Sequence, residues 1–222
     1  MASSMIDILG QQLGQEAMAG MLAQKTGLDP NTARQAVKIG LPLIVAALAR
    51  NSADAKGADA LSGALARDHD GSLLDNLDGY LQQGGNPSMG DAILGHVLGS
   101  DRSKIEAEVG RETGLDPSVL AKLLPLLAPL VLAYLGRAQR QDQLSPGDLS
   151  GYLDRERATI EQTGFPGLLP PSQAKPAPRS TLQEQGADIL SGMLDADKDG
   201  SVTDDAARIG MGMLGKLLRR KG

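Results

Sequence analysis

One short segment near the C-terminus combines residue types and a spacing that can do chemistry. Asp195, Asp197 and Asp199 alternate along the chain, Gly200 follows them directly, and Ser201 comes next. Carboxylates at the first, third and fifth loop positions, a glycine at the sixth and a backbone carbonyl at the seventh are typical of a calcium-binding loop between two helices. Negative charges this close repel one another unless a cation neutralises them. The spacing therefore predicts a metal site with Ca²⁺ as its ion.

The loop departs from the full calcium motif at its end. The twelfth position, which normally supplies a bidentate glutamate, is Ala206, and the nearest carboxylates are Asp204 and Asp205. We expect a tighter loop of lower affinity, with these ligands: Asp195, Asp197, Asp199, Ser201 and Asp205. Asp204 is the alternative to Asp205. Two other interpretations stay open: a magnesium or transient ion site, and a solvated acidic loop in which Asp199 and Thr203 only cap the next helix.

The composition excludes several other kinds of site. The 222 residues include no cysteine, which rules out disulfides, thiolate metal sites and cysteine nucleophiles. His69 and His96 are the two histidines, and no catalytic constellation can be assigned around them. The net charge of −5 argues against a broad basic surface for duplex DNA. We therefore expect a protein that is not an enzyme and has no nucleic-acid partner. Acidic neighbours on both sides of His69 predict a raised pKa for that imidazole if they lie close.

The chain before the acidic loop contains an internal repeat. Its matching blocks keep their order: ILGxxLG at 8–14 and 93–99, TGLDP at 26–30 and 113–117, PL at 42–43 and 129–130, and LSGxL at 61–65 and 149–153. Arg50 likewise matches Arg137. Self-similarity of this kind indicates repeated structural units. We expect two tandem copies of one unit, at about residues 7–81 and 92–165, within a domain that spans residues 1–165.

Helix signals recur in both copies. In each TGLDP block the aspartate can cap a helix whose first turn contains the proline, and the glycine suits the left-handed end of the preceding helix. Serine and aspartate three residues apart at 72–75 and 145–148 have the spacing of a capping box. No stretch shows the sustained two-residue alternation of a strand. The sequence predicts an all-α fold.

Two apolar runs, at residues 39–49 and 123–136, predict buried core helices. Both runs are shorter than the roughly 20 residues of a membrane-spanning helix, and both contain proline, so we expect no membrane contact. Glycine falls inside the helical patterns at Gly10, Gly14, Gly20 and Gly95. Because a helical glycine costs about 1 kcal/mol relative to alanine, we expect these positions to allow close approach between helices.

The composition changes after residue 165. Prolines crowd residues 166–180, which we expect to form a semi-extended linker. Residues 181–222 then form a separate helix–loop–helix around the acidic loop, with apolar faces that can pack on the repeat or on another chain. Val202, at the eighth loop position, would pair with a neighbouring loop of the same kind. A single loop of this type therefore favours self-association.

The tandem blocks ILGxxLG…TGLDP…PLxxAxLxR and the tail LDxDxDGSVxDD resemble a bacterial family. It is the YidB-like group, the domain of unknown function 937, and the resemblance covers about residues 5–165 and 186–215. The resemblance implies a compact helical bacterial protein without enzymatic activity and without catalytic residues to transfer. It also implies that the shortened acidic loop, Asp195 to Asp205, is a family feature.

These observations together predict a helical interaction or scaffold module. Its C-terminal loop binds Ca²⁺, which orders the tail or promotes self-association, and its partner is a protein or a second copy. The alternative function is a structural, self-assembling helical protein in which the metal is incidental. The absence of a visible signal peptide predicts a cytoplasmic location. Because a low-affinity calcium loop suits the millimolar calcium outside the membrane, a periplasmic or extracellular location by non-standard export stays open.

Overall fold

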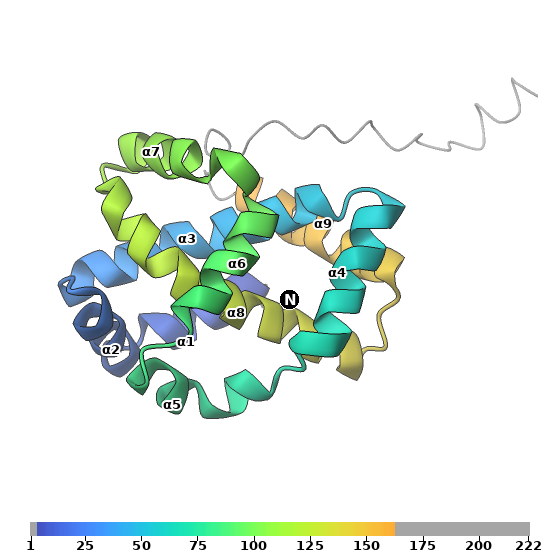
Figure 1. Cartoon of the computed structure of the whole chain (residues 1–222), viewed down its shortest axis with the longest axis horizontal. Coiled ribbons are helices and arrows are strands. Elements are labelled where there is room, and N and C mark those ends of the chain that lie inside the picture. Colours follow the sequence, from blue (N-terminus) through green and yellow to red (C-terminus); the bar gives the residue numbers. More distant parts are fainter. Residues whose placement is uncertain (1–3, 163–222) are drawn as a thin grey trace, which may run out of the picture. The chain divides into compact units, whose positions relative to one another are not determined.

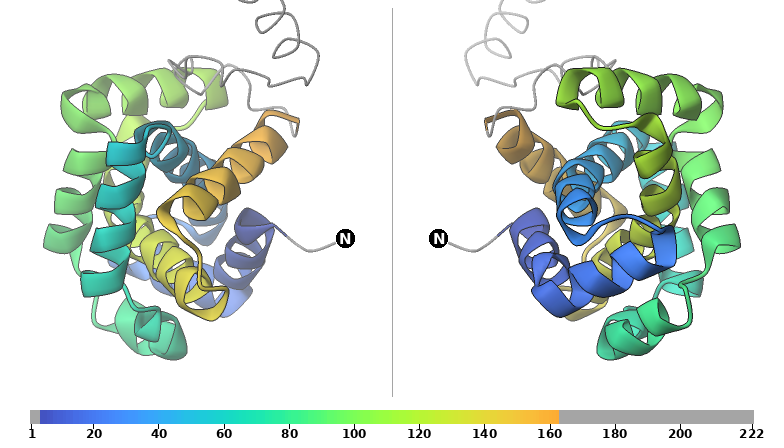
Figure 2. Two further views of the ribbon diagram at one scale, coloured as in Figure 1. Left: turned by 90° about the vertical axis from the view of Figure 1, so that its right-hand side faces the viewer. Right: turned by 90° about the vertical axis from the view of Figure 1, so that its left-hand side faces the viewer.

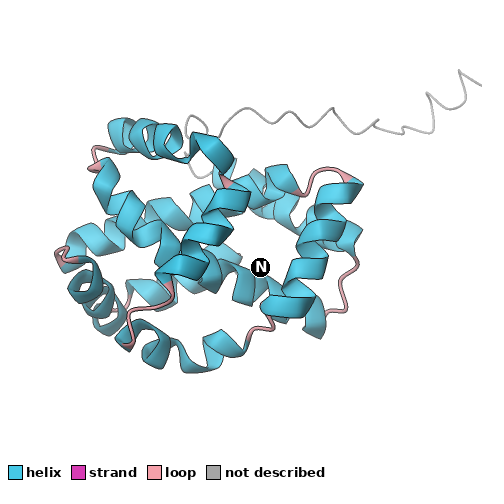
Figure 3. Ribbon diagram, viewed as in Figure 1, coloured by secondary structure: helices cyan, strands magenta, loops and turns pink. Residues whose placement is uncertain are grey.

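The computed structural model describes residues 4–162. Within this range the chain is all-helical, with short turns between helices and no strand, as the sequence predicts (Figure 3). The helices of the first half are α1 (Met5–Gly14), α2 (Glu16–Thr26), α3 (Pro30–Asn51) and α4 (Ala55–Asp68). A 3-10 helix, η1 (Ser72–Asn76), and a short helix, α5 (Leu77–Gln82), follow. The second half contains α6 (Pro87–Val97), η2 (Gly99–Asp101), α7 (Arg102–Thr113), α8 (Pro117–Gln141) and α9 (Pro146–Gln162).

The two long helices, α3 and α8, form the centre of this helical body. They pack against each other, and the shorter helices surround them (Figure 1). Helices α1 and α2 pack on α3, whereas α6 and α7 pack on α8, on the opposite side of the body (Figure 2). Every residue of α3 from Leu41 to Ala49 is buried, as is every residue of α8 from Leu123 to Ala133. Burial on all faces is typical of a helix at the centre of a core.

Both central helices are longer than the apolar runs within them. At 22 and 25 residues, α3 and α8 are long and apolar enough to cross a membrane, but 78% and 83% of their most apolar windows are buried inside the body. Core helices pass the same test of length and composition. The prediction of buried core helices is confirmed. Both helices extend beyond the apolar runs, because Pro42, Pro125 and Pro129 lie inside the helices and do not end them.

The two central helices begin in the same way. Asp29 Oδ1 accepts hydrogen bonds from the backbone N–H groups of Asn31 and Thr32, both at 3.0 Å. Asp116 Oδ1 accepts one from Ser118 at 2.8 Å. A carboxylate at this position satisfies N–H groups that have no partner inside the helix. The predicted N-caps of both TGLDP blocks are therefore confirmed, and the glycine of each block ends the preceding helix with φ near 71°.

The prolines inside α8 leave backbone carbonyls that other helices use. Proline lacks an N–H, so Pro125 cannot donate to the carbonyl of Ala121 four residues earlier. Arg102 on α7 donates to that carbonyl instead, with Nη2 at 3.4 Å. Pro129 likewise leaves the carbonyl of Pro125, and Gly90 of α6 lies directly against it. Helices α6 and α7 are thus seated where the α8 hydrogen-bond ladder is interrupted.

The glycines that allow close helix approach are not the ones expected from the sequence. A Cβ built at Gly14, Gly20 or Gly95 meets nothing within 4 Å, and at Gly10 it meets only Leu41 Cδ1, at 4.0 Å. The close approaches lie elsewhere, at Gly90 and Gly136 among others, where an added Cβ would strike backbone oxygen. Periodicity identified glycines on helices, but the packing direction of each helix decides which of them lies at a contact.

Candidate functional site

The predicted metal ligands lie outside the described residues. These ligands are Asp195, Asp197, Asp199, Ser201 and Asp205, with Asp204 as the alternative, and the linker at 166–180 lies outside as well. Within residues 4–162, no group of three or more histidine, aspartate or glutamate side chains could hold a metal ion. The calcium loop therefore stays a prediction from the sequence.

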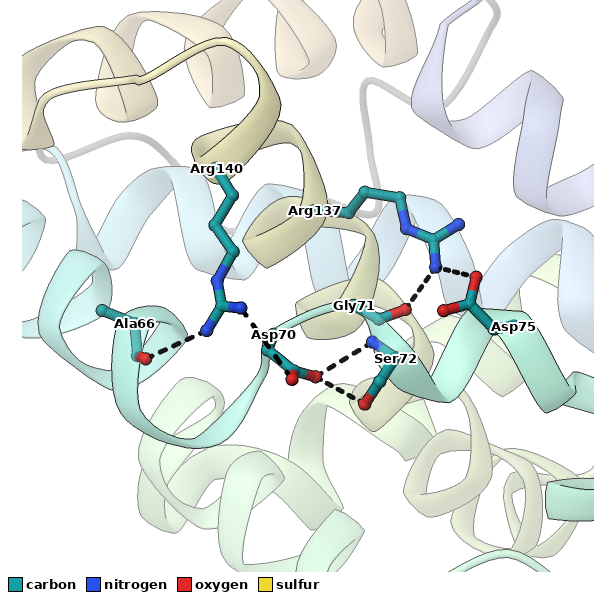
Figure 4. Close-up of polar contacts among 7 residues, drawn as sticks. All are labelled: Ala66, Asp70, Gly71, Ser72, Asp75, Arg137 and Arg140. Carbon is teal, nitrogen blue, oxygen red and sulfur yellow. Dashed lines mark hydrogen bonds and ion pairs between the residues drawn. The ribbon is translucent and has the colours of Figure 1, made fainter.

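A cluster of charged groups joins the last turns of α8 to the segment after α4 (Figure 4). Arg137 and Arg140 are three residues apart on α8, a spacing that places both on one face of the helix. They face the turn at Asp70 and Gly71, where the chain leaves α4 and enters η1. Gly71 has a φ of 87°, a left-handed conformation that favours glycine.

Arg137 holds the backbone of this turn. Its Nη2 donates to the carbonyl of Gly71 at 2.6 Å and also pairs with the carboxylate of Asp75 on η1. Asp75 therefore does not form the capping box with Ser72 that its spacing predicts. Ser72 pairs instead with Asp70 Oδ1, through its backbone N–H at 2.9 Å and through its hydroxyl. The capping box predicted at 145–148 is confirmed, since Ser145 and Asp148 bond reciprocally.

Arg140 contacts the last turn of α4 and the residue Asp70 beyond it. Its Nη2 donates to the carbonyl of Ala66 at 3.4 Å, and its Nη1 lies 3.9 Å from Asp70 Oδ2. The hydrogen bonds from Ser72 lower the pKa of Asp70, so its carboxylate stays charged opposite the arginine. Both arginines thus contact carboxylates and backbone carbonyls between Ala66, in the last turn of α4, and Asp75 on η1. What this arrangement does is hold one half of the helical body against the other.

His69 precedes this turn, and its pKa differs from the prediction. The pKa of the imidazole is lowered, because burial penalises the charged form, and the attraction of Asp68 only partly opposes that effect. The expectation of a raised pKa is wrong: sequence neighbours show the nearby charge but not the burial. His96 lies on a different helix, α6, and is exposed.

Arg102 forms a second cluster, which joins three helices. Its Nη1 lies 2.7 Å from Asp91 on α6, its Nε lies 2.7 Å from Glu106 on α7, and it reaches the carbonyl of Ala121 on α8. Burial alone would lower the pKa of Arg102, but the hydrogen bonds and charges of Glu106 and Asp91 outweigh burial and raise it. Glu106 is buried, so the guanidinium supplies the partner that its charge requires.

A buried carboxylate joins the first and last described helices. Glu156 on α9 is 7% exposed, and its Oε1 accepts a hydrogen bond from the backbone N–H of Met5 at 3.1 Å. Its Oε2 has no hydrogen-bond partner among the described residues. Burial raises the pKa of the neighbouring Tyr152, and the negative charge of Glu156 raises it further. Glu156 thus places a carboxyl group at the N-terminus of α1, where the helix dipole favours negative charge.

One known protein family matches the sequence of this helical body. The sequence model of a bacterial protein of unknown function (DUF937) matches residues 7–138. The chain belongs to this family. Neither the curated proteins nor the solved structures contain a match to the chain.

The DUF937 match covers most of the described body. It begins within α1 and ends within α8, and it therefore includes Arg102, Asp70 and Arg137. Arg140, all of α9 with Glu156, and the acidic loop lie beyond residue 138. Both TGLDP blocks, which carried the resemblance, lie inside the match. Assignment to DUF937 on those blocks is confirmed.

Sequence reasoning missed the three arginines as organising residues. Arg102 and Arg137 are half-buried and Arg140 is exposed, and no local motif around them marks an arginine that contacts a distant helix. One signal was available for Arg102, because the prolines of α8 imply unpaired carbonyls that need a donor. Which arginine supplies that donor depends on the packing of α7 on α8, since the two residues, Arg102 and Ala121, lie on different helices.

Proposed function

We propose that this DUF937 protein is a non-enzymatic helical interaction module whose C-terminal loop binds Ca²⁺. The observation that carries the proposal is the spacing of Asp195, Asp197 and Asp199 followed by Gly200. Three carboxylates at alternate positions before a glycine provide hard oxygen ligands around one centre, which suits a hard divalent cation. Asp205 closes the site, and Ser201 contributes its backbone carbonyl.

The proposed role of the ion is to order the C-terminal segment. Without a cation the loop carboxylates repel one another, and folding of the two flanking helices toward the loop is opposed. With Ca²⁺ bound, the repulsion becomes attraction to the ion, and the apolar residues of the flanking helices can pack on the body or on a second copy. Those residues include Ile189, Leu194, Ile209 and Met213.

The described body supports a scaffold role over a catalytic one. Its three arginine contacts, at Arg102, Arg137 and Arg140, each join one helix to another helix or connector through a carboxylate and a backbone carbonyl. Groups used in this way fix the positions of helices. We further propose that the body consists of two tandem copies, since α1 to α4 and α6 to α9 follow one order of lengths and since α3 and α8 both begin with a capping aspartate and a proline.

Calorimetric titration of Ca²⁺ into the full-length chain tests the proposal. We expect binding with a dissociation constant of about 0.1–1 mM, since the loop lacks the glutamate at position twelve. The double variant Asp195→Ala/Asp197→Ala should lose this heat. The matched control Asp59→Ala/Asp78→Ala removes the same charge from exposed positions on the body and should keep it.

Equal heats for the loop variant and the wild-type protein would overturn the calcium proposal. Single variants then assign the closing ligand: Asp205→Ala should weaken binding, whereas Asp204→Ala should leave it close to wild type. Light scattering with calcium and with chelator separates the two functions that the sequence allows. Association that calcium promotes fits the calcium-dependent module, and polymers that form equally in chelator would favour metal-independent self-assembly.

A further inference from the structure

The body has two halves, α1 to α5 and α6 to α9. Two hydrogen bonds between these halves involve equivalent positions of the repeat, with the roles of the two halves reversed. Gln139 on α8 donates from Nε2 to the hydroxyl of Ser62 on α4 at 2.6 Å. Ser150 on α9 donates from its hydroxyl to the carbonyl of Ser52, at the end of α3, at 2.7 Å. Ser62 and Ser150 occupy the same place in the two LSGxL blocks. Ser52 and Gln139 each lie two residues after a matched arginine, Arg50 or Arg137.

The helices pack with the same reciprocity: the last helix of each half packs on the long helix of the other half. Helix α4 of the first half packs on α8 of the second, and α9 of the second half packs on α3 of the first. Helices α4 and α9 also pack on each other, as do α3 and α8 (Figure 2). Each half therefore contributes its long helix and its last helix to a shared core. This is the geometry of a self-complementary interface, in which a contact from one side has a counterpart from the other.

Neither half has a complete core of its own. Where α3 and α8 meet, Leu124 and Leu127 on α8 lie against Gly40 on α3, and both leucines are fully buried. Removal of one half would open these side chains to water, which is unfavourable in proportion to the apolar area exposed. The covalent link between the halves runs through the turn after α5, where Gln83 is exposed and Gly84 has a φ of 89°.

We infer that the surface that joins the two halves is a binding surface for a second copy of this chain: the first half of one copy binds the second half of another. Within a single chain the two halves bind each other, because the covalent link holds them at high effective concentration. Exchange of halves between copies uses the same contacts and adds none, which makes it a low-cost route to association. The inference rests on residues 4–162 and does not depend on calcium.

A protease site inserted between Gln83 and Gly84 of the full-length chain tests this inference. After cleavage, the two pieces should remain together as one particle with the native mass and helical content of the intact chain. Two cleaved preparations, one tagged on its first half and the other on its second, are then mixed without denaturant and allowed to reach equilibrium. We expect as many doubly tagged and untagged particles as parental ones, since each half accepts its counterpart from either copy.

Two outcomes would overturn the inference. Either the pieces separate or unfold on cleavage, or the mixed native particles keep only their parental combinations. Gly136→Ala provides a graded test, because its Cβ would lie 1.6 Å from the carbonyl oxygen of His69 at the end of α4 and so push the halves apart. Cleaved Gly136→Ala protein should exchange its halves faster under native conditions. A Cβ added at Gly95 meets nothing within 4 Å, so cleaved Gly95→Ala protein should exchange its halves at the wild-type rate.

Discussion

Gly90 lies against the carbonyl oxygen of Pro125 so closely that a Cβ at position 90 would be 1.8 Å from it. That carbonyl is free because Pro129, four residues later, has no N–H to donate. A proline in α8 and a glycine in α6 therefore form one structural feature: the first exposes a backbone oxygen, and the second lets the neighbouring helix approach it. The contact sets the position of α6 on the central helix.

We predict that Gly90→Ala destabilises the protein by about 3 kcal/mol or more, because the clash is with backbone and can be relieved only by moving a helix. Urea unfolding followed by circular dichroism measures the change. Gly95→Ala on the same helix is the matched control, and it should stabilise by up to about 1 kcal/mol, since alanine is the better helix former and nothing lies near its Cβ. Equal effects of the two substitutions would contradict the close contact.

Loss of the Arg102 side chain should be costly as well. Arg102→Ala leaves buried Glu106 without its cationic partner and the carbonyl of Ala121 without a donor, so we expect about 3 kcal/mol of destabilisation. Arg111→Ala on the same helix removes an exposed arginine and should change stability by less than about 0.5 kcal/mol. The same unfolding measurement applies. If Arg102→Ala is as mild as Arg111→Ala, the cluster does not hold the three helices together.

The lowered pKa of His69 predicts that the free energy of unfolding depends on pH. Because its pKa in the folded protein is lowered from the ordinary 6.5, the folded state favours the neutral imidazole. The corresponding stabilisation is fully present above pH 6.5 and is lost as the pH falls through the folded pKa. His69→Gln should therefore flatten the stability profile between about pH 7 and pH 5. A His69→Gln variant whose stability profile keeps the wild-type slope between about pH 7 and pH 5 would contradict the assignment to His69.

Local helix signals could be predicted from the sequence, and the contacts between helices could not. Asp29 and Asp116 cap their helices as expected, because a cap depends on residues two or three positions away. Ser72 and Asp75 have the spacing of a capping box. In the structure, however, Asp75 forms an ion pair with Arg137, and Ser72 donates its hydroxyl to Asp70. Arg137 is distant in the sequence, so its competition for Asp75 becomes visible only when α8 is in place.

The glycines and histidines show the same limit. The sequence places Gly95 and Gly90 on one helix, but only the crossing of α6 over α8 decides that Gly90 is the one in contact. The acidic neighbours of His69 are visible in the sequence, whereas its burial is a property of the packed body. The acidic loop is the opposite case, because its metal ligands lie within one short segment and the spacing alone suggests the chemistry.

Hydrogen–deuterium exchange of residues 181–222 in the full-length chain, compared in calcium and in chelator, tests the central claim most directly. If the loop from Asp195 to Asp205 binds Ca²⁺ and orders this segment, its amides should exchange more slowly in calcium. The Asp195→Ala/Asp197→Ala variant should exchange at the chelator rate in both conditions. Identical exchange of the wild-type segment with calcium and with chelator would contradict the claim.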